Sequence, residues 1–316
     1  MATGAAAGLG AGAGAAAAAE PTLGPIRAVT TTAHDLAAVE HAYSKWLGYR
    51  VVERGVVPEA TARSWGAPAV AGRAMLSMAP EAGEPTLLRF VEQAMPARFK
   101  PMTTLGWNST EIIVRDCDAV ARRLEGSPFR IVGPPKDLSS SGEIRALQAI
   151  GPANEMLYLT ATTRPMPPER DMPTAEAFIG RTFITVLGGR SMAEMSEYYR
   201  TTFGRPTGQT FSTRIGSLAT QMEVPPDTIF QIAVVQLGGG AKLELDAYPA
   251  SAGPRPRPRG ALPVGMAIVS FDCSDLDRHA ANMAAPPAPA QIAPFAGRRS
   301  GVVTGSAGEL IELIES

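Results

Sequence analysis

Two stretches of the chain, YSKWLG at residues 43–48 and YRTTFG at residues 199–204, decide the fold because they align with each other without a gap. Each closes a segment that follows a β-like run, at residues 25–32 in the first case and 181–186 in the second. The apolar residues of both segments recur at helical spacing, and a glycine ends each helix. The chain therefore contains an internal repeat that starts with a strand and a helix.

A second pair of segments has the same beginning. Residues 109–114 lead into Asp-Cys-Asp at 116–118, and residues 267–271 lead into Asp-Cys-Ser at 272–274, each followed by an expected helix. Further β-like runs follow the helices, at residues 143–149, 156–160, 228–237, 242–246 and 310–314. Each of the four units therefore reads as one strand, one helix and three strands, which predicts an α+β protein.

This pattern resembles the vicinal oxygen chelate superfamily, which includes glyoxalases, bleomycin-resistance proteins and extradiol dioxygenases. The resemblance is carried by YSKWLGY at residues 43–49 and by the final run SAGELIEL at residues 306–313. It covers residues 22–161 and 179–316. It implies four βαβββ modules, paired into two curved-sheet, glyoxalase-like domains that each close around a pocket.

Four segments follow from this reading of the chain. We expect a disordered Ala/Gly tail at 1–21, a first domain of two modules at 22–161, a Pro-rich linker at 162–178 and a second domain of two modules at 179–316. The tail lacks the basic and apolar regions of a secretory signal, which predicts a cytoplasmic protein. The run PRPRPR at residues 254–259 predicts an exposed, extended basic loop.

Composition narrows the classes of partner. The chain of 316 residues is 45% hydrophobic and 19% charged, with a formal net charge of −1. This balance argues against a nucleic-acid binder with a basic face, and the absence of a long apolar run argues against a membrane span. Two cysteines and three histidines leave little material for a metal site. We expect a small-molecule ligand, and the composition leaves a homo-oligomer open.

The resemblance also implies positions for metal ligands, with His on the first strands of the modules and Glu on the last. Counting eight residues back from each helix start places Ala28, Ser109, Ile184 and Ile268 at the first-strand positions. The last-strand positions are Arg89, Tyr158, Glu244 and Glu312. A divalent transition metal needs about three N or O ligands, and an arginine would repel it. We therefore expect neither a metal nor another cofactor.

Without a metal, the side chains themselves would carry the chemistry. We expect Glu312, Glu244 and Tyr158 to be catalytic, because a carboxylate between apolar strand neighbours has a raised pKa and a tyrosine can donate a proton. We expect a substrate-binding set of Arg89, Ser109, Trp107, Arg145 and Lys242, in which arginine holds an anionic group and Trp107 stacks on an aromatic ring. The alternatives are structural: Glu312 paired with a nearby cation, and both arginines on the solvent face.

The function that these expectations favour is a metal-independent enzyme of the lyase or isomerase type. It would act on a small oxygenated metabolite, aromatic ones included, by Glu or Tyr proton transfer. A protein that binds and sequesters a small molecule without chemistry is the alternative, and a metal-dependent extradiol dioxygenase is a third reading that the histidine placement disfavours. The sequence does not decide which domain holds the working pocket.

Overall fold

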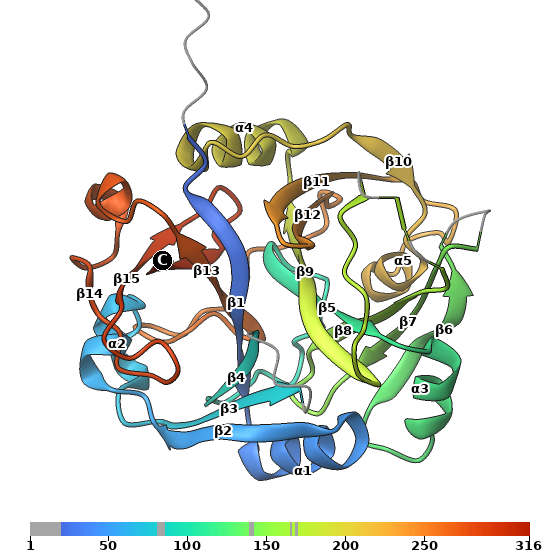
Figure 1. The fold of residues 1–316 in the computed structure, drawn as a ribbon, viewed down its shortest axis with the longest axis horizontal. Coiled ribbons are helices and arrows are strands. Elements are labelled where there is room, and N and C mark those ends of the chain that lie inside the picture. Colours follow the sequence, from blue (N-terminus) through green and yellow to red (C-terminus); the bar gives the residue numbers. More distant parts are fainter. Residues whose placement is uncertain (1–19, 81–85, 139–141, 165, 168–169) are drawn as a thin grey trace, which may run out of the picture.

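Two curled sheets lie side by side in the computed structural model, which describes residues 20–80, 86–138, 142–164, 166–167 and 170–316 (Figure 1). Helices α1 and α4 lie at opposite ends of the boundary between the sheets (Figure 1). Except for its last two residues, the tail expected at 1–21 lies outside the described residues. The α+β fold of four modules in two curved sheets is thus confirmed.

The modules follow one another along the chain with the expected order of elements. The first consists of β1 (Leu23–Ala33), α1 (Leu36–Leu47), β2 (Tyr49–Val56), α2 (Glu59–Ser64), the 3₁₀ helix η1 (Pro68–Val70), β3 (Ala74–Pro80) and β4 (Leu87–Glu92). The second consists of β5 (Gly106–Val114), α3 (Cys117–Arg123), β6 (Arg130–Asp137), β7 (Ile144–Ile150) and β8 (Met156–Thr162). The third consists of β9 (Ile179–Gly189), α4 (Met192–Phe203), β10 (Phe211–Thr213), α5 (Gly216–Met222), β11 (Phe230–Gly238) and β12 (Ala241–Ala247). The fourth consists of β13 (Met266–Cys273), the 3₁₀ helix η3 (Asp277–Asn282), β14 (Ala288–Pro289), β15 (Arg299–Thr304) and β16 (Leu310–Glu315).

The two helices that carry the sequence repeat also share their ends. Asp35 accepts a hydrogen bond from the backbone N–H of the third residue of α1, and Ser191 does the same for α4. Both helices stop at a glycine in the left-handed region, Gly48 at φ 68° and Gly204 at φ 66°, a conformation that favours glycine. The repeat read from the sequence is therefore a repeat of local backbone structure.

The sheets combine the modules in an order that the sequence did not predict. One sheet has the strand order β14-β15-β16-β13-β1-β4-β3-β2, and the other β10-β11-β12-β9-β5-β8-β7-β6. The first module therefore pairs with the fourth through the antiparallel strands β1 and β13, and the second with the third through β5 and β9. The expected pairings, first module with second and third module with fourth, were wrong. All four first strands have similar apolar patterns, so the patterns do not specify which of them pair.

The main hydrophobic core fills the space between the two sheets, and strand alternation turns the polar residues of the same strands away from it. Leu243 and Leu245 of β12 and Ile311 and Leu313 of β16 all belong to this core. Side chains alternate between the faces of a strand, so the residues between them project from the opposite, concave face of each sheet. Candidate polar sites are therefore expected there, one in each sheet.

The basic run at residues 254–259 is not simply an exposed loop. The half-buried guanidinium of Arg255 donates to the carbonyl of Leu105, at 3.1 Å, and to Oδ1 of Asn108, at 3.0 Å, on the side of β5. It also donates to the carbonyl of Val264, at 3.1 Å, just before β13. This side chain therefore joins the two sheets, and the expectation of full exposure was wrong for it.

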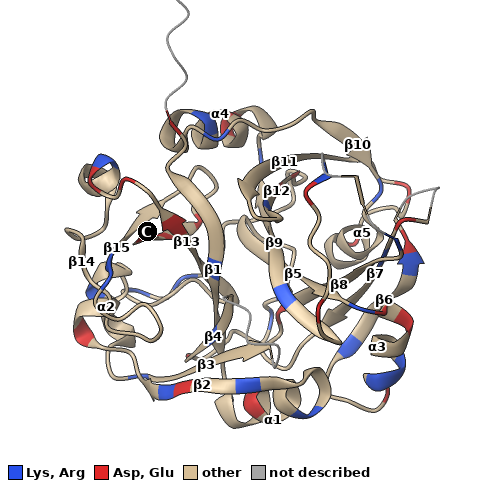
Figure 2. Cartoon of the chain, viewed as in Figure 1, with Lys and Arg blue, Asp and Glu red and all other residues tan. Residues whose placement is uncertain are grey.

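Charged residues of both signs are interspersed over both halves of the molecule (Figure 2). Several form exposed ion pairs, such as Arg54 with Glu40 at 2.6 Å. Within the described ranges, no helix is both long and apolar enough to cross a membrane.

Candidate functional site

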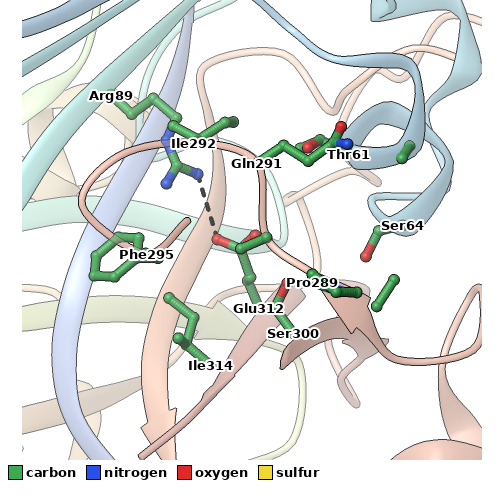
Figure 3. A pocket seen from close by; sticks show the side chains of 13 residues that line it. Thr61, Ser64, Arg89, Pro289, Gln291, Ile292, Phe295, Ser300, Glu312 and Ile314 are labelled. Carbon is green, nitrogen blue, oxygen red and sulfur yellow. Dashed lines mark hydrogen bonds and ion pairs between the residues drawn. The ribbon is translucent and has the colours of Figure 1, made fainter. Parts of the chain in front are cut away.

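A pocket opens on the concave face of the sheet formed by the first and fourth modules (Figure 3). Helix α2, strands β4, β15 and β16, and the segment 288–295 surround it. Its empty volume is about 400 Å³ when the space open to solvent is included. The lining residues are Ala60, Thr61, Ser64, Arg89, Ala288, Pro289, Ala290, Gln291, Ile292, Phe295, Ser300, Glu312 and Ile314.

Arg89 and Glu312 form a buried ion pair in this pocket (Figure 3). Arg89 is 1% exposed, and its Nη1 donates to Oε2 of Glu312 and to Oγ1 of Thr30, both at 3.3 Å. Nε of Arg89 is buried and has no hydrogen-bond partner among the described residues. The guanidinium therefore keeps donor capacity beyond its contacts with the protein.

Two further donors hold the Glu312 carboxylate. The indole N–H of Trp65 donates to Oε1 at 2.9 Å, and the hydroxyl of Ser270 donates to Oε2 at 2.5 Å. The Trp65 ring also lies 5.4 Å from the guanidinium carbon of Arg89, within the range of a cation–π contact. Trp65 thus contacts both members of the ion pair and fixes their relative position.

The strand register corrects the first-strand positions expected from the sequence. Thr30 lies opposite Arg89, and Ser270 lies opposite Glu312. The first-strand residues beside Arg89 and Glu312 are therefore Thr30 and Ser270, each two positions further along its strand than the expected Ala28 and Ile268. In the other sheet, the same shift replaces Ser109 with Glu111, which lies opposite Tyr158, and replaces Ile184 with Val186, which lies opposite Glu244.

The equivalent face of the other sheet holds a buried cluster of carboxyl groups. The hydroxyl of Thr160 donates to Glu111, and Glu244 and Asp246 share a side-chain hydrogen bond. Burial raises the pKa of Glu111 to about 7, and the nearby Glu244 contributes to this rise. Burial likewise raises the pKa of Asp246 to about 7 and, together with the charge of Asp246, the pKa of Glu244 well above its ordinary range.

Tyr158 and Lys242 lie at the edge of this carboxyl cluster. The Tyr158 hydroxyl is 2.8 Å from the hydroxyl of Ser217 on α5, and burial raises the pKa of the phenol. The ammonium of Lys242 donates to the carbonyl of Asp171, which belongs to the segment expected as a linker, and burial lowers the pKa of this lysine. Lys242 is thus bound to the backbone rather than ion-paired with Glu244.

Neither face fits the metal site that the resemblance implies. In the first sheet the positions level with one another hold Thr30, Arg89, Ser270 and Glu312, a set with one carboxylate and one permanent cation. In the second sheet they hold Glu111, Tyr158, Val186 and Glu244. In the part of the chain that the structure describes, no group of three or more His, Cys, Asp or Glu residues could hold a metal ion. We therefore derive no chemical step through a metal.

The residues expected to act together are divided between the two sheets. Arg89 and Glu312 meet in the pocket, whereas Tyr158, Glu244 and Lys242 lie in the other sheet. The expectation that Arg89 and Tyr158 share a site was wrong, because the modules pair differently.

The other expected ligand-binding residues lie away from the pocket. Trp107 is 1% exposed in the core, where its indole donates to the carbonyl of Leu310 at 2.7 Å. Arg145 forms surface ion pairs with Asp118, at 2.8 Å, and Asp137, at 2.9 Å. Ser109 is fully buried on β5, and its hydroxyl has no partner among the described residues.

The residues of the two faces that were not expected from the sequence include Thr30, Trp65, Glu111 and Ser270. The signal for three of them is strand alternation, because a residue two positions along a strand faces the same side. Trp65 follows a six-residue helix in a connection without periodicity, and no pattern in the sequence points to its contact with Glu312.

Comparison with solved structures relates this geometry to known proteins. Glyoxalase I from Zea mays superposes with a TM-score of 0.60 at 13% sequence identity over 92% of both chains. A mutant of the same glyoxalase I gives 0.62 at 14% identity, over 92% of both chains. A putative dioxygenase from Bacillus subtilis gives 0.59 at 14% identity, over 93% of this chain and 86% of the other. No protein-family model and no curated protein matches the sequence. The chain therefore has a glyoxalase-like fold.

Proposed function

We propose that this protein is a metal-independent enzyme of the lyase or isomerase type that acts on a small oxygenated metabolite in the Arg89–Glu312 pocket. The observation that carries the proposal is the Glu312 carboxylate in the pocket wall, held by three donors, one of which is the buried Arg89. A carboxylate in a fixed position next to a cation is a pair suited to proton transfer from carbon or oxygen.

The proposed chemistry uses the two members of the pair differently. Glu312 accepts a proton from the ligand carbon, and the electron pair of the broken C–H bond moves toward an adjacent carbonyl oxygen. Arg89 donates to that oxygen as its negative charge grows. In an isomerisation Glu312 returns the proton to a neighbouring atom. In an elimination the electron pair expels a leaving group instead. Trp65 and Ser270 keep the carboxylate in place during either step.

Hydrogen exchange with solvent tests this proposal before a substrate is known. The protein is incubated in D2O with a panel of small carbonyl compounds, and the loss of the α-proton signal is followed by NMR. We expect exchange with wild type, and Glu312→Gln should slow it by roughly 10²–10⁴-fold, the usual effect of removing a general base. Glu92→Gln, at an exposed site at the end of β4, serves as the control and should exchange at the wild-type rate.

Independence from metal needs its own measurement. Chelator treatment should leave both the exchange rate and the melting temperature unchanged, because no metal free energy would be coupled to folding. A rate that falls with chelation and returns with one added metal would contradict this part of the proposal.

The carboxyl cluster of the other sheet is the second candidate for proton transfer. Glu244 and Tyr158 are the residues that we propose there. Burial raises the pKa of the Glu244 carboxyl group, so that it can hold a proton near neutral pH. Burial also raises the pKa of the Tyr158 phenol, which keeps its proton and can donate a hydrogen bond to the ligand. If Glu312→Gln exchanges at the wild-type rate while Glu244→Gln does not, the catalytic role belongs to this cluster.

A binding protein without chemistry is the second candidate function. It is favoured by the fact that Glu312 already has three protein donors, so the pair is stable without a ligand. Saturable binding of a carbonyl compound without any exchange of its protons would favour this function over the enzyme.

A further inference from the structure

We propose that residues 171–176 form a strap that closes one end of the concave face of the second sheet and can be displaced from it. The strap belongs to the connection between β8 and β9, within the segment that the sequence predicts as a Pro-rich linker. It controls access to the carboxyl cluster of that sheet, and the proposal holds whichever of the two faces is catalytic.

The connection that contains the strap is much longer than its ends require. Strands β8 and β9 are the two neighbours of β5, parallel and antiparallel to it, so β8 ends and β9 starts at the same edge of the sheet. Strands two apart are separated by about 10 Å, which about three extended residues would span. The chain instead places 16 residues between Thr162 and Ile179. Connections of this length in a compact fold usually have a function of their own.

The two ends of the strap are anchored on different strands. At the start of β12, Oδ2 of Asp171 accepts from the N–H of Gly240 at 3.0 Å, and its backbone carbonyl accepts from the ammonium of Lys242 at 2.5 Å. Beyond the end of β5, the carbonyl of Glu176 accepts from the guanidinium of Arg115 at 2.5 Å. Because β9 lies between β12 and β5, the chain between these anchors crosses β9.

The strap lies on the same face of the sheet as the carboxyl cluster. Met172 and Ala175 are half-buried against an apolar cluster that includes Ile184 of β9. Ile184 lies opposite Lys242 on one side and opposite Glu111 on the other, so these three side chains share one face. The strap therefore covers the end of the face at which Lys242, 6% exposed, and Glu111, 8% exposed, are located.

The strap is also held weakly enough to move. None of its six residues belongs to a helix or a strand, and none is fully buried. Asp171 has φ 41°, in the left-handed region, which a residue other than glycine adopts at a cost in free energy. Segments with few buried apolar contacts and no regular hydrogen bonding open at a lower free energy than the whole fold. Loss of the Asp171 contacts would thus release the strap without unfolding the sheet.

Acetylation of lysine side chains tests the proposal, because Lys242 lies under the strap and the other three lysines are exposed. The full-length protein is treated briefly with an acetylating reagent, and the rate at Lys242 relative to that at the exposed Lys45 is measured by peptide mass spectrometry. In wild type we expect Lys242 to react about ten-fold more slowly than Lys45, or slower still. Asp171→Ala should raise the Lys242 rate about ten-fold or more, and Met172→Ser should raise it through loss of packing on Ile184.

Matched variants separate opening of the strap from other causes of faster acetylation. Asp171→Asn removes the charge near Lys242 but keeps an acceptor for the N–H of Gly240, so it should react like wild type. Thr174→Ala, at an exposed position of the strap, should also react like wild type. Melting temperature and alkylation of the buried Cys117 thiol report unfolding, and both should stay at wild-type values in every variant.

Three results would overturn the proposal. The first is a Lys242 rate in Asp171→Ala and Met172→Ser equal to that in wild type. The second is an equal rise in Asp171→Asn and Asp171→Ala, which would assign the effect to charge. The third is a rise that comes with a lower melting temperature and a reactive Cys117, because the segment would then be an inseparable part of the fold.

Discussion

Tyr43 on α1 and Glu155, in the turn before β8, share a buried hydrogen bond: the phenol donates to Oε1 of the carboxyl group at 2.6 Å. The same relationship recurs in the second half of the chain, where Tyr199 on α4 donates to Oε1 of Glu309 at 3.1 Å. Each bond joins two modules that are neighbours in the chain but belong to different sheets. The first and second modules, and likewise the third and fourth, are therefore connected by helix-to-turn contacts across the core rather than by strand pairing.

Removing either phenol should destabilise the fold. Tyr43→Phe and Tyr199→Phe each leave Oε1 of a buried carboxyl group without its side-chain donor, which typically costs about 1–3 kcal/mol. Urea denaturation gives the free energy of unfolding. Tyr198→Phe is the matched control, because the Tyr198 hydroxyl makes its 3.2 Å bond to a backbone carbonyl at an exposed site. Unfolding free energies equal for Tyr43→Phe and Tyr198→Phe would show that the buried bond does not stabilise the fold.

Stability should decrease as the pH rises from about 4.5 toward 7. Burial raises the pKa of Glu111, Glu155, Asp246 and Glu309 to about 7 each. In the unfolded chain these groups ionise near their ordinary values, so between the two pKa values the native state binds more protons. Their contribution is complete below the unfolded pKa, falls through this window and is lost above the folded pKa. Melting temperatures measured from pH 4.5 to 8 should decline and then level off.

The variant Glu111→Gln tests how much of this pH dependence of the melting temperature comes from Glu111. It removes one of the titrating groups while keeping the shape of the side chain, so the melting temperature should fall less steeply with pH. Glu125→Gln, at an exposed site, should keep the wild-type slope. A melting temperature that rises from pH 5 to 7 would contradict the assignment.

Removing one member of the Arg89–Glu312 ion pair should destabilise the fold more than removing both members. Glu312→Gln leaves the guanidinium of Arg89 buried without a counter-charge, a change that costs roughly 3–5 kcal/mol for buried pairs. The double variant Arg89→Met with Glu312→Gln removes both charges and should recover much of that loss. A double-mutant cycle by denaturant unfolding measures the coupling. Additive effects would show that the two charges do not depend on each other.

Arg255 should stabilise the junction between the sheets more than its place in a loop suggests. Arg255→Lys keeps the charge but cannot reproduce donation from one planar group to acceptors on both sides. We expect the free energy of unfolding to fall by about 2 kcal/mol or more, since hydrogen bonds to charged groups are the stronger kind. Arg259→Lys, in the same Pro–Arg run at an exposed position, is the control and should leave stability unchanged.

Local structure was predictable from the sequence, and long-range register was not. Asp35, Ser191 and the two helix-ending glycines act on helix ends a few residues away in the sequence. Their effect can be read from the local sequence, so the strands and helices were predicted close to their observed bounds. The positions of Thr30 and Ser270 depend on how strands slide past each other, and counting back from a helix start was wrong by two residues there. The helix expected after β13 is a short 3₁₀ helix, since Pro286 and Pro287 follow it closely and disfavour a longer α-helix.

The sequence indicated which residues are candidates for the site, but it did not indicate which of them lie in the same pocket. Glu312 and Arg89 were both expected to be functional, but each was assigned to a different pocket, because β1 was not expected to pair with β13. Strand pairing between distant modules is set by packing of the whole core, and the apolar patterns of four similar strands do not encode it. Trp65 was missed for another reason: a side chain from a connection of irregular structure leaves no periodic signal.

The pairing of the first module with the last has a consequence for the protein as it leaves the ribosome. Strand β1 pairs with β13 at residues 266–273, which are made only after the second and third modules. The second and third modules are contiguous, and their sheet can form while the chain is still growing. Until β13 is made, the edge of β1 that it will cover stays unpaired while the second and third modules can already be folded. An unpaired strand edge favours aggregation, so this is the stage of folding at which a chaperone would be needed most.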